Sequence, residues 1–139
     1  MSWLFWSLLS ALFAGATAIL AKIGVENVDS NYATAIRTSV VVVFAWLVVS
    51  ITHAPGTFTA RSGRTWLFLT LSGCATGLSW LCYFRALQLG PASRVAVIDK
   101  LSVAFVILFA VLFLGERLTP GKAIGGMLIV AGAITVAWG

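Results

Sequence analysis

Long apolar segments fill nearly the whole chain, and short polar breaks separate them. The segments span about residues 3–24, 32–52, 65–89, 92–114 and 121–138. Each approaches or exceeds the roughly 20 residues that an α-helix needs to cross about 30 Å of hydrocarbon. The breaks contain turn-forming sequences, namely Asp29-Ser30-Asn31, Pro55-Gly56, Gly90-Pro91 and the stretch from Gly115 to Pro120. The pattern predicts an all-α integral membrane protein in which residues 1–139 form one domain of five transmembrane helices.

The composition supports a place in the lipid bilayer. Of the 139 residues, 60% are hydrophobic and only 9% are charged, and the mean hydropathy is +1.04. Soluble domains carry about 25% charged residues. The net charge of +5 would indicate nucleic acid binding in a soluble protein, but here the basic residues are scattered at helix ends and form no run. We therefore expect a multi-pass cell-membrane protein whose basic residues meet lipid and not nucleic acid.

The distribution of basic residues determines the orientation only weakly. Five helices place the two termini on opposite sides of the membrane. The side of the N-terminus receives Arg61, Arg64, Arg117 and Lys122. The opposite side receives Lys22 and Arg94, and also Arg37 and Arg85 if these reach the interface. Without Arg37 and Arg85 the count is four basic residues against two, which favours a cytoplasmic N-terminus. With them the count is four against four, which leaves both orientations open.

An acid and a base lie inside the fourth apolar segment. If this helix begins near Ala92, a rise of about 1.5 Å per residue places Asp99 about 10 Å below the membrane surface, and Lys100 follows directly. Neighbouring residues on a helix do not face each other, so we expect these two charges not to pair in good geometry. Each then needs a partner elsewhere, and Arg37 and Arg85 are the candidates for Asp99.

These charges have two interpretations. In the first, Asp99 forms a structural ion pair with Arg37 or Arg85, and the ammonium of Lys100 extends toward the membrane surface. In the second, they belong to a functional site, because ionisable residues at bilayer depth usually face a bundle interior or a polar cavity and mark a pathway.

Aromatic residues on the third helix extend the second interpretation. Trp80 lies deep in this helix, and Tyr83 and Leu87 follow it on the same face. Aromatic residues at helical spacing are often packing residues, so packing and cavity lining both stay open. The cavity interpretation predicts a site between the third and fourth helices, formed by Trp80, Tyr83, Arg85, Asp99, Lys100 and, from the second helix, Arg37.

Glycine pairs mark faces on which helices approach closely in lipid. Gly73 and Gly77 form a GxxxG pair in the third helix, and Gly121, Gly125 and Gly132 lie on one stripe of the fifth. These faces fit either close packing within one subunit or a dimer seam. For the seam, we favour the fifth helix.

No motif of an enzyme or a metal site occurs in the sequence. A nucleotide-binding glycine loop and the patterns GxSxG, HExxH and CxxC are all absent. The single histidine, His53, lies in a predicted loop, and Cys74 and Cys82 lie about 12 Å apart along one helix, too far for a disulfide. We therefore expect no enzymatic activity, no metal and no cofactor.

Three sequence features together resemble the EamA domain of the drug/metabolite transporter superfamily. They are the run YFRALQLGPAS at residues 83–93, the apolar stretch from Val106 that ends in FLGERLT at residues 113–119, and the glycines from Gly125 to Gly132. The resemblance covers essentially the whole chain as a single five-helix copy, whereas better-known relatives carry two such domains in tandem. It implies export or exchange of small metabolites or drugs by alternating access in a bacterial inner membrane. It also implies that a lone copy works as a homodimer.

The chain departs from the family pattern in its fourth helix. Many members have a proline and apolar residues midway along this helix, where this chain has Ile98-Asp99-Lys100-Leu101-Ser102. The related four-helix multidrug exporters carry a membrane carboxylate in the first helix, but this chain has no acid before Glu26. Asp99 is therefore an analogous candidate for proton coupling and not the family's own residue.

The sequence thus predicts a dimeric secondary transporter with a small-molecule substrate. Asp99 would be the coupling or cation-binding acid, and Lys100 and the arginines would balance it or bind an anionic group. The alternative is a non-transporting membrane subunit or scaffold whose charges only hold helices together. The substrate, the coupling ion, the direction of flux and the parallel or antiparallel arrangement of the dimer stay open.

Overall fold

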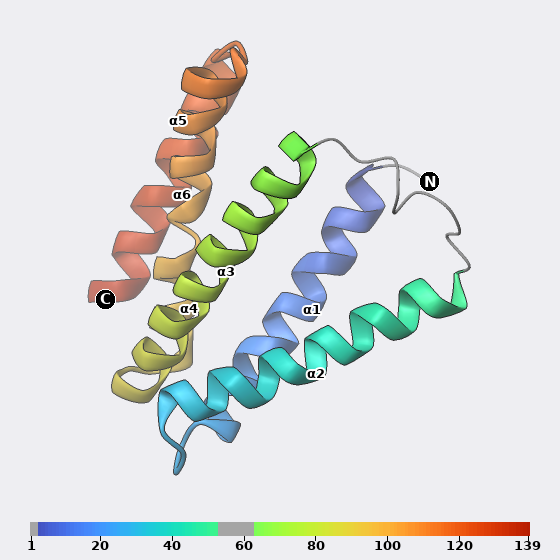
Figure 1. Cartoon of the computed structure of the whole chain (residues 1–139). Helices are drawn as coiled ribbons and strands as arrows, with labels where there is room; N and C mark the ends of the chain where they lie inside the picture. The colour runs from blue at the N-terminus through green and yellow to red at the C-terminus, as the bar shows by residue number, and fades with distance from the viewer. Residues whose placement is uncertain (1–2, 53–62) are drawn as a thin grey trace. The chain divides into compact units, whose positions relative to one another are not determined.

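The computed structural model describes residues 3–52 and 63–139, and all secondary structure in these residues is helical (Figure 1). The predicted break at Pro55-Gly56 and the neighbouring His53 and Arg61 lie outside the described residues. The helices are α1 (Trp3–Gly24), α2 (Ser30–Ile51), α3 (Gly63–Leu89), α4 (Ala92–Asp99), α5 (Ser102–Leu114) and α6 (Pro120–Trp138). Because α4 and α5 share one apolar span, the described residues contain five spans long and apolar enough to cross a membrane. The predicted all-α membrane fold is confirmed.

Side-chain caps place the starts of α2 and α6 slightly earlier than the hydrophobic pattern does. Asp29 caps α2, and its carboxylate accepts hydrogen bonds from the backbone N–H of Asn31 at 2.9 Å and of Tyr32 at 3.4 Å. The Thr119 hydroxyl caps α6 in the same way and accepts from the N–H of Lys122 at 3.3 Å. Such caps satisfy N–H groups that the first helical turn leaves unpaired.

A left-handed glycine ends α5. Gly115 has φ +66°, a conformation that costs other residues about 1–2 kcal/mol because Cβ meets the following carbonyl. The N–H groups of Gly115 and Glu116 both reach back to the carbonyl of Ala110. The helix therefore ends at Leu114, where the sequence predicts its end.

The fourth predicted helix is interrupted, which corrects the prediction of one continuous helix over residues 92–114. α4 ends at Asp99, and α5 begins at Ser102. Between them the backbone tightens, because the N–H of Lys100 bonds the carbonyl of Val97 at 3.1 Å and the N–H of Leu101 bonds that of Ile98 at 2.9 Å. These are three-residue spacings typical of a 3₁₀ turn. The interruption lies at the two adjacent charged residues, Asp99 and Lys100.

The helices belong to two compact units, which are described separately. One unit, Leu20–Gln88, contains the end of α1 with α2 and α3. Its buried residues gather around the α1–α2 connection and the last turns of α3, and they are Ala21, Val25, Ser30, Thr34, Phe84 and Leu87. The site residues of this unit therefore lie near its best-packed end.

The other unit, Met1–Ile19 and Leu89–Gly139, contains the start of α1 with α4, α5 and α6. Within it α6 packs against both α4 and α5, and Figure 1 shows α5 and α6 as an antiparallel pair. A Cβ atom placed on Gly126 would lie 3.2 Å from Cδ1 of Ile107. Gly126 therefore provides the close approach of α6 to α5.

Large apolar side chains are exposed along every helix, from Trp3 on α1 to Trp138 on α6. In water such a surface would promote aggregation, but in a bilayer it faces hydrocarbon. Cys74 and Cys82 are both free and exposed. The pattern of exposure agrees with membrane-spanning helices.

Candidate functional site

A polar face on α2 provides the first part of the candidate site. Ser30, Thr34, Arg37 and Thr38 recur at helical spacing and share this face. The hydroxyl of Thr34 donates to the carbonyl of Ser30, and the hydroxyl of Thr38 donates to that of Thr34, both at 2.7 Å. Carbonyls of the same helix thus satisfy both hydroxyls. Arg37 is the charged residue of this face.

An apolar face on α3 provides the second part. Trp80, Phe84 and Leu87 follow at intervals of four and three residues, so they lie on one face of the helix. Phe84 is 3% exposed and Leu87 is fully buried, whereas Trp80 is half-buried. Helical spacing predicted Trp80, Tyr83 and Leu87 on this face but not Phe84, although Phe84 lies four residues after Trp80.

The guanidinium of Arg37 lies over these aromatic rings. Its Cζ atom is 4.3 Å from the centre of the Trp80 ring and 5.6 Å from that of Phe84. A cation over an aromatic face gains about 0.5–1 kcal/mol when exposed and about 2 or more when desolvated. Arg37 is seven residues from the start of α2 and therefore lies about 10 Å below that end of the span. The rings thus stabilise a charge that lies about two helical turns into this apolar span.

Neither acid of its own unit forms an ion pair with Arg37. The acids of this unit are Glu26 and Asp29, both in the connection between α1 and α2, and the carboxylate of Asp29 caps α2. The aromatic contacts do not neutralise the positive charge of Arg37, and a guanidinium has five N–H donors that can bind an anion. Within this unit the arginine is therefore an anion-binding group without a protein anion.

Hydrogen bonds hold together the end of this unit at which α1 and α3 end and α2 begins. The ammonium of Lys22 donates to the carbonyl of Leu87 at 2.5 Å, and the side-chain amide of Gln88 donates to the carbonyl of Val28 at 2.6 Å. Arg85 is exposed and donates to the amide oxygen of Gln88 at 3.1 Å. Arg85 therefore supports this hydrogen-bonded end and does not join Arg37 on the aromatic face.

Tyr83 lies beside the aromatic face. It is half-buried, and its ring centre is 6.5 Å from that of Phe84 in an edge-to-face arrangement. Such pairs contribute about 0.5–1.5 kcal/mol beyond the area that they bury. Of the predicted site residues in this unit, the structure thus brings Arg37 and Trp80 into contact and places Tyr83 next to their partner Phe84.

Asp99 and Lys100 lie in the other unit, at the interruption between α4 and α5. The ammonium of Lys100 is 3.7 Å from Oδ2 of Asp99, so the two charges approach each other but do not pair in good geometry, as the sequence predicts. The lysine stem is long and both side chains are substantially exposed, which lets the ammonium reach the neighbouring carboxylate. The distance exceeds that of a hydrogen bond, so the pair is loose. Pairing of Asp99 with Arg37 or Arg85 stays a prediction.

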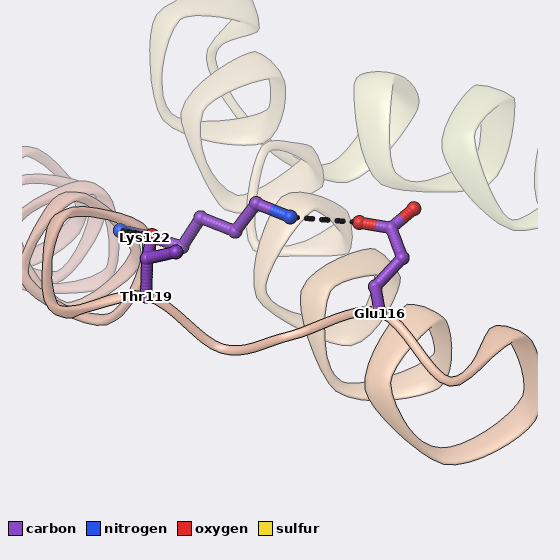
Figure 2. A network of polar contacts seen from close by, with 3 residues as sticks. All are labelled: Glu116, Thr119 and Lys122. Carbon is purple, nitrogen blue, oxygen red and sulfur yellow. Dashed lines mark hydrogen bonds and ion pairs between the residues drawn. The ribbon is translucent and has the colours of Figure 1, made fainter.

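A second charged pair spans the connection between α5 and α6. The ammonium of Lys122 donates to Oε2 of Glu116 at 2.8 Å, and Figure 2 shows both side chains with the Thr119 cap beside them. Both members are about half exposed. The pair lies at the end of the span, in the connection between α5 and α6, outside the candidate site.

A shallow groove of about 350 Å³ runs between α5 and α6. Its lining is almost entirely aliphatic and includes Ala104, Ile107, Ala123, Gly126 and Val130, with Lys122 as its charged residue. Such a lining offers little to orient a polar solute. The groove is therefore a weaker candidate than the Arg37 face.

The predicted packing glycines make no close contact within their own units. No atom of its unit lies within 4 Å of a Cβ built at any of these positions, namely Gly73, Gly77, Gly121, Gly125 and Gly132. The glycine that packs within a unit is Gly126, on a different face of α6. A role of the predicted glycines in a dimer seam stays a prediction.

Comparisons with known proteins agree with this architecture. Residues 1–138 match the model of the EamA-like transporter family. A Sinorhizobium sp. protein described as an uncharacterized transporter in the cobO 3' region is 53% identical to this chain. The alignment covers 98% of this chain and 96% of that protein. No solved structure matches the chain.

Proposed function

This chain belongs to the EamA-like transporter family, and we propose that it is the subunit of a homodimeric secondary transporter that exports small metabolites or drugs by alternating access. The match covers five apolar spans. Family membership supports a function in transport. We add to it the direction of export, the homodimer and the coupling of transport to protons.

The interruption of the fourth span is the observation that carries the proposal of coupling. Discontinuous helices near the bilayer midplane commonly form the solute and ion sites of secondary transporters. Asp99 is the acid within the helices of the described chain, and it lies at the last position of α4, just before the turn at Lys100 and Leu101. We assign Asp99 the coupling role, with Lys100 as the cation that neutralises it when it is ionised.

The face of Arg37, Trp80 and Phe84 supports a solute-binding role. It combines a charge at bilayer depth with aromatic surface, whereas the groove between α5 and α6 is aliphatic. Intramembrane ionisable groups are costly and therefore commonly mark solute or ion pathways. Tyr83 flanks this face, and Arg85 supports the adjacent hydrogen-bonded end.

Two copies would provide the second half that transporters with repeated domains carry in one chain. The relative from Sinorhizobium sp. has nearly the same length as this chain. The stripe of Gly121, Gly125 and Gly132 offers a surface for close helix approach that its own unit leaves open. We place the dimer seam on this stripe.

Solute counterflow in proteoliposomes tests the proposal. The purified protein is reconstituted with a panel of labelled metabolites, and uptake is measured with and without a pH gradient. We expect at least one solute class to exchange, and we expect Asp99→Asn to abolish the response to the gradient while the protein remains a folded dimer by size-exclusion chromatography.

Glu116→Gln is the matched control, because Glu116 also pairs with a lysine but lies at the end of a span. This variant should retain gradient-driven flux. If Asp99→Asn instead reduces folding or assembly without a specific transport defect, Asp99 is structural and the chain is better described as a membrane scaffold. If no solute exchanges through the wild-type protein, the transport proposal fails.

A further inference from the structure

We propose that Arg37, stacked on Trp80 and Phe84, binds the carboxylate of the transported solute, so that the substrates are small organic anions or zwitterions. This inference rests on the proposed function and gives it a substrate class. Arg37, Trp80 and Phe84 all lie within the unit Leu20–Gln88.

The partners of the acids leave Arg37 without a carboxylate in its own unit. The sequence has four acids, and all of them lie in the described residues. The Asp29 carboxylate caps α2, Asp99 is 3.7 Å from Lys100, and Glu116 pairs with Lys122. Glu26 is exposed in the connection after α1. An intramembrane cation normally has an anionic or carbonyl partner, and a solute carboxylate can supply that anion.

The geometry at Arg37 suits a planar anion. Its Cζ atom lies 4.3 Å from the Trp80 ring centre, which is the spacing of a guanidinium over a ring face. The N–H groups of a guanidinium form a fork that matches the two oxygens of a carboxylate. A single guanidinium balances a single negative charge, so a carboxylate fits better than a phosphate dianion.

The same face would be a poor site for a cationic solute. Trp80 and Phe84 could attract an ammonium group, but Arg37 already occupies their faces and would repel it. The structure therefore separates two substrate classes that the family resemblance leaves together. Organic cations are the class against which this site discriminates.

The test uses solutes that differ in charge and little in shape. The probes are butyrate, butyramide and butylammonium, together with phenylacetate, phenylacetamide and phenethylammonium. Binding is measured by thermal shift of the detergent-solubilised protein, and flux by counterflow in proteoliposomes. We expect carboxylates to bind at least about tenfold more tightly than the matched amides, because bonds to charged groups are strong enough for that factor.

Variants of Arg37 then assign the preference to this side chain. Arg37→Gln should remove the preference for carboxylates, and Arg37→Lys should retain part of it because the charge remains without the planar fork. Arg64→Gln is the matched control, since Arg64 lies 5.7 Å from the Phe68 ring but is exposed at the start of α3. This control should bind carboxylates as the wild type does.

Three results would overturn the inference. The first is equal or tighter binding of the amides or ammonium probes, and the second is carboxylate preference that survives Arg37→Gln. The third is that both Arg37→Gln and Arg37→Lys fail to fold and that adding Asp99→Asn to either variant restores folding. This result would identify Asp99 as the anion for Arg37. Flux of neutral or cationic probes alone contradicts this inference and leaves the transporter proposal standing, whereas absence of flux for every solute contradicts both.

Discussion

The ammonium of Lys22, near the end of α1, donates a 2.5 Å hydrogen bond to the carbonyl of Leu87, 65 residues later in the last turn of α3. The last carbonyls of a helix have no partner in the helix and carry partial negative charge, so a cation is favourable there. The Leu87 side chain is fully buried at the same position. One residue of α3 therefore receives both a charged contact and apolar packing.

Loss of this contact should destabilise the protein. We expect Lys22→Met to lower the free energy of unfolding by about 1–3 kcal/mol, because hydrogen bonds to charged groups contribute about 1.5–3 kcal/mol and the methionine retains part of the packing. The measurement is SDS-induced unfolding in mixed micelles. Arg94→Met, at an exposed basic residue near the start of α4, is the control. Equal effects of the two variants would show that charge at the interface, and not this hydrogen bond, matters.

Gly115 should tolerate substitution poorly because of its left-handed backbone. Gly115→Ala should cost about 1–2 kcal/mol, since Cβ then approaches the next carbonyl. Gly63→Ala is the control, because Gly63 begins α3 and has open space around it. The difference in unfolding free energy between the two variants is the quantity to measure. A Gly115→Ala protein as stable as Gly63→Ala would contradict the left-handed end of α5.

Gly126 in α6 and Gly15 in α1 both lie inside helices but differ in their surroundings. Alanine at Gly126 would meet Cδ1 of Ile107 at 3.2 Å, whereas alanine at Gly15 would meet nothing within 4 Å. We expect Gly126→Ala to be less stable than Gly15→Ala by about 1 kcal/mol, the lower end of the cost of overpacking.

The same pair of variants in an Ile107→Val background isolates the cause. Valine lacks the Cδ1 atom, so the difference between Gly126→Ala and Gly15→Ala should disappear. Contacting residues show such non-additive effects, whereas distant residues do not. A difference that persists in this background would mean that Ile107 is not the neighbour that limits Gly126.

The pair of Glu116 and Lys122 should contribute little to stability. Its members are 50% and 46% exposed, and exposed ion pairs are worth about 0.2–1 kcal/mol. A double-mutant cycle with Glu116→Gln and Lys122→Met should give a coupling free energy below about 1 kcal/mol that falls further as salt is added. A larger coupling that is insensitive to salt would place the pair in a water-excluded environment.

The apolar pattern predicted the spans well because the bilayer constrains them directly. Every backbone group in hydrocarbon must be paired, so a long apolar segment has little choice except a helix. Turn residues also predicted where helices end, as at Gly115 and Gly90-Pro91. The interruption at Lys100 and Leu101 was not predicted, because no proline or glycine marks it and the flanking sequence is strongly apolar.

The sequence predicted residues for a candidate site, and the structure adds the side-chain contacts among them. Trp80 and Arg37 were selected by their type and depth, but their contact with each other and with Phe84 appears only once α2 and α3 are packed. Sequence spacing also predicted that Asp99 and Lys100 would not pair in good geometry, and the structure brings their charged atoms only to 3.7 Å, beyond hydrogen-bond distance.

The sequence by itself determined the membrane class, the five spans and the family, because these depend on apolar length and on local motifs such as FLGERLT. The tertiary structure decided which polar groups meet. It paired Lys22 with Leu87, stacked Arg37 on Trp80 and brought Gly126 against Ile107. The physical reason is that lipid selects helices by their average hydrophobicity, whereas each contact between helices depends on rotation and register that no single segment encodes.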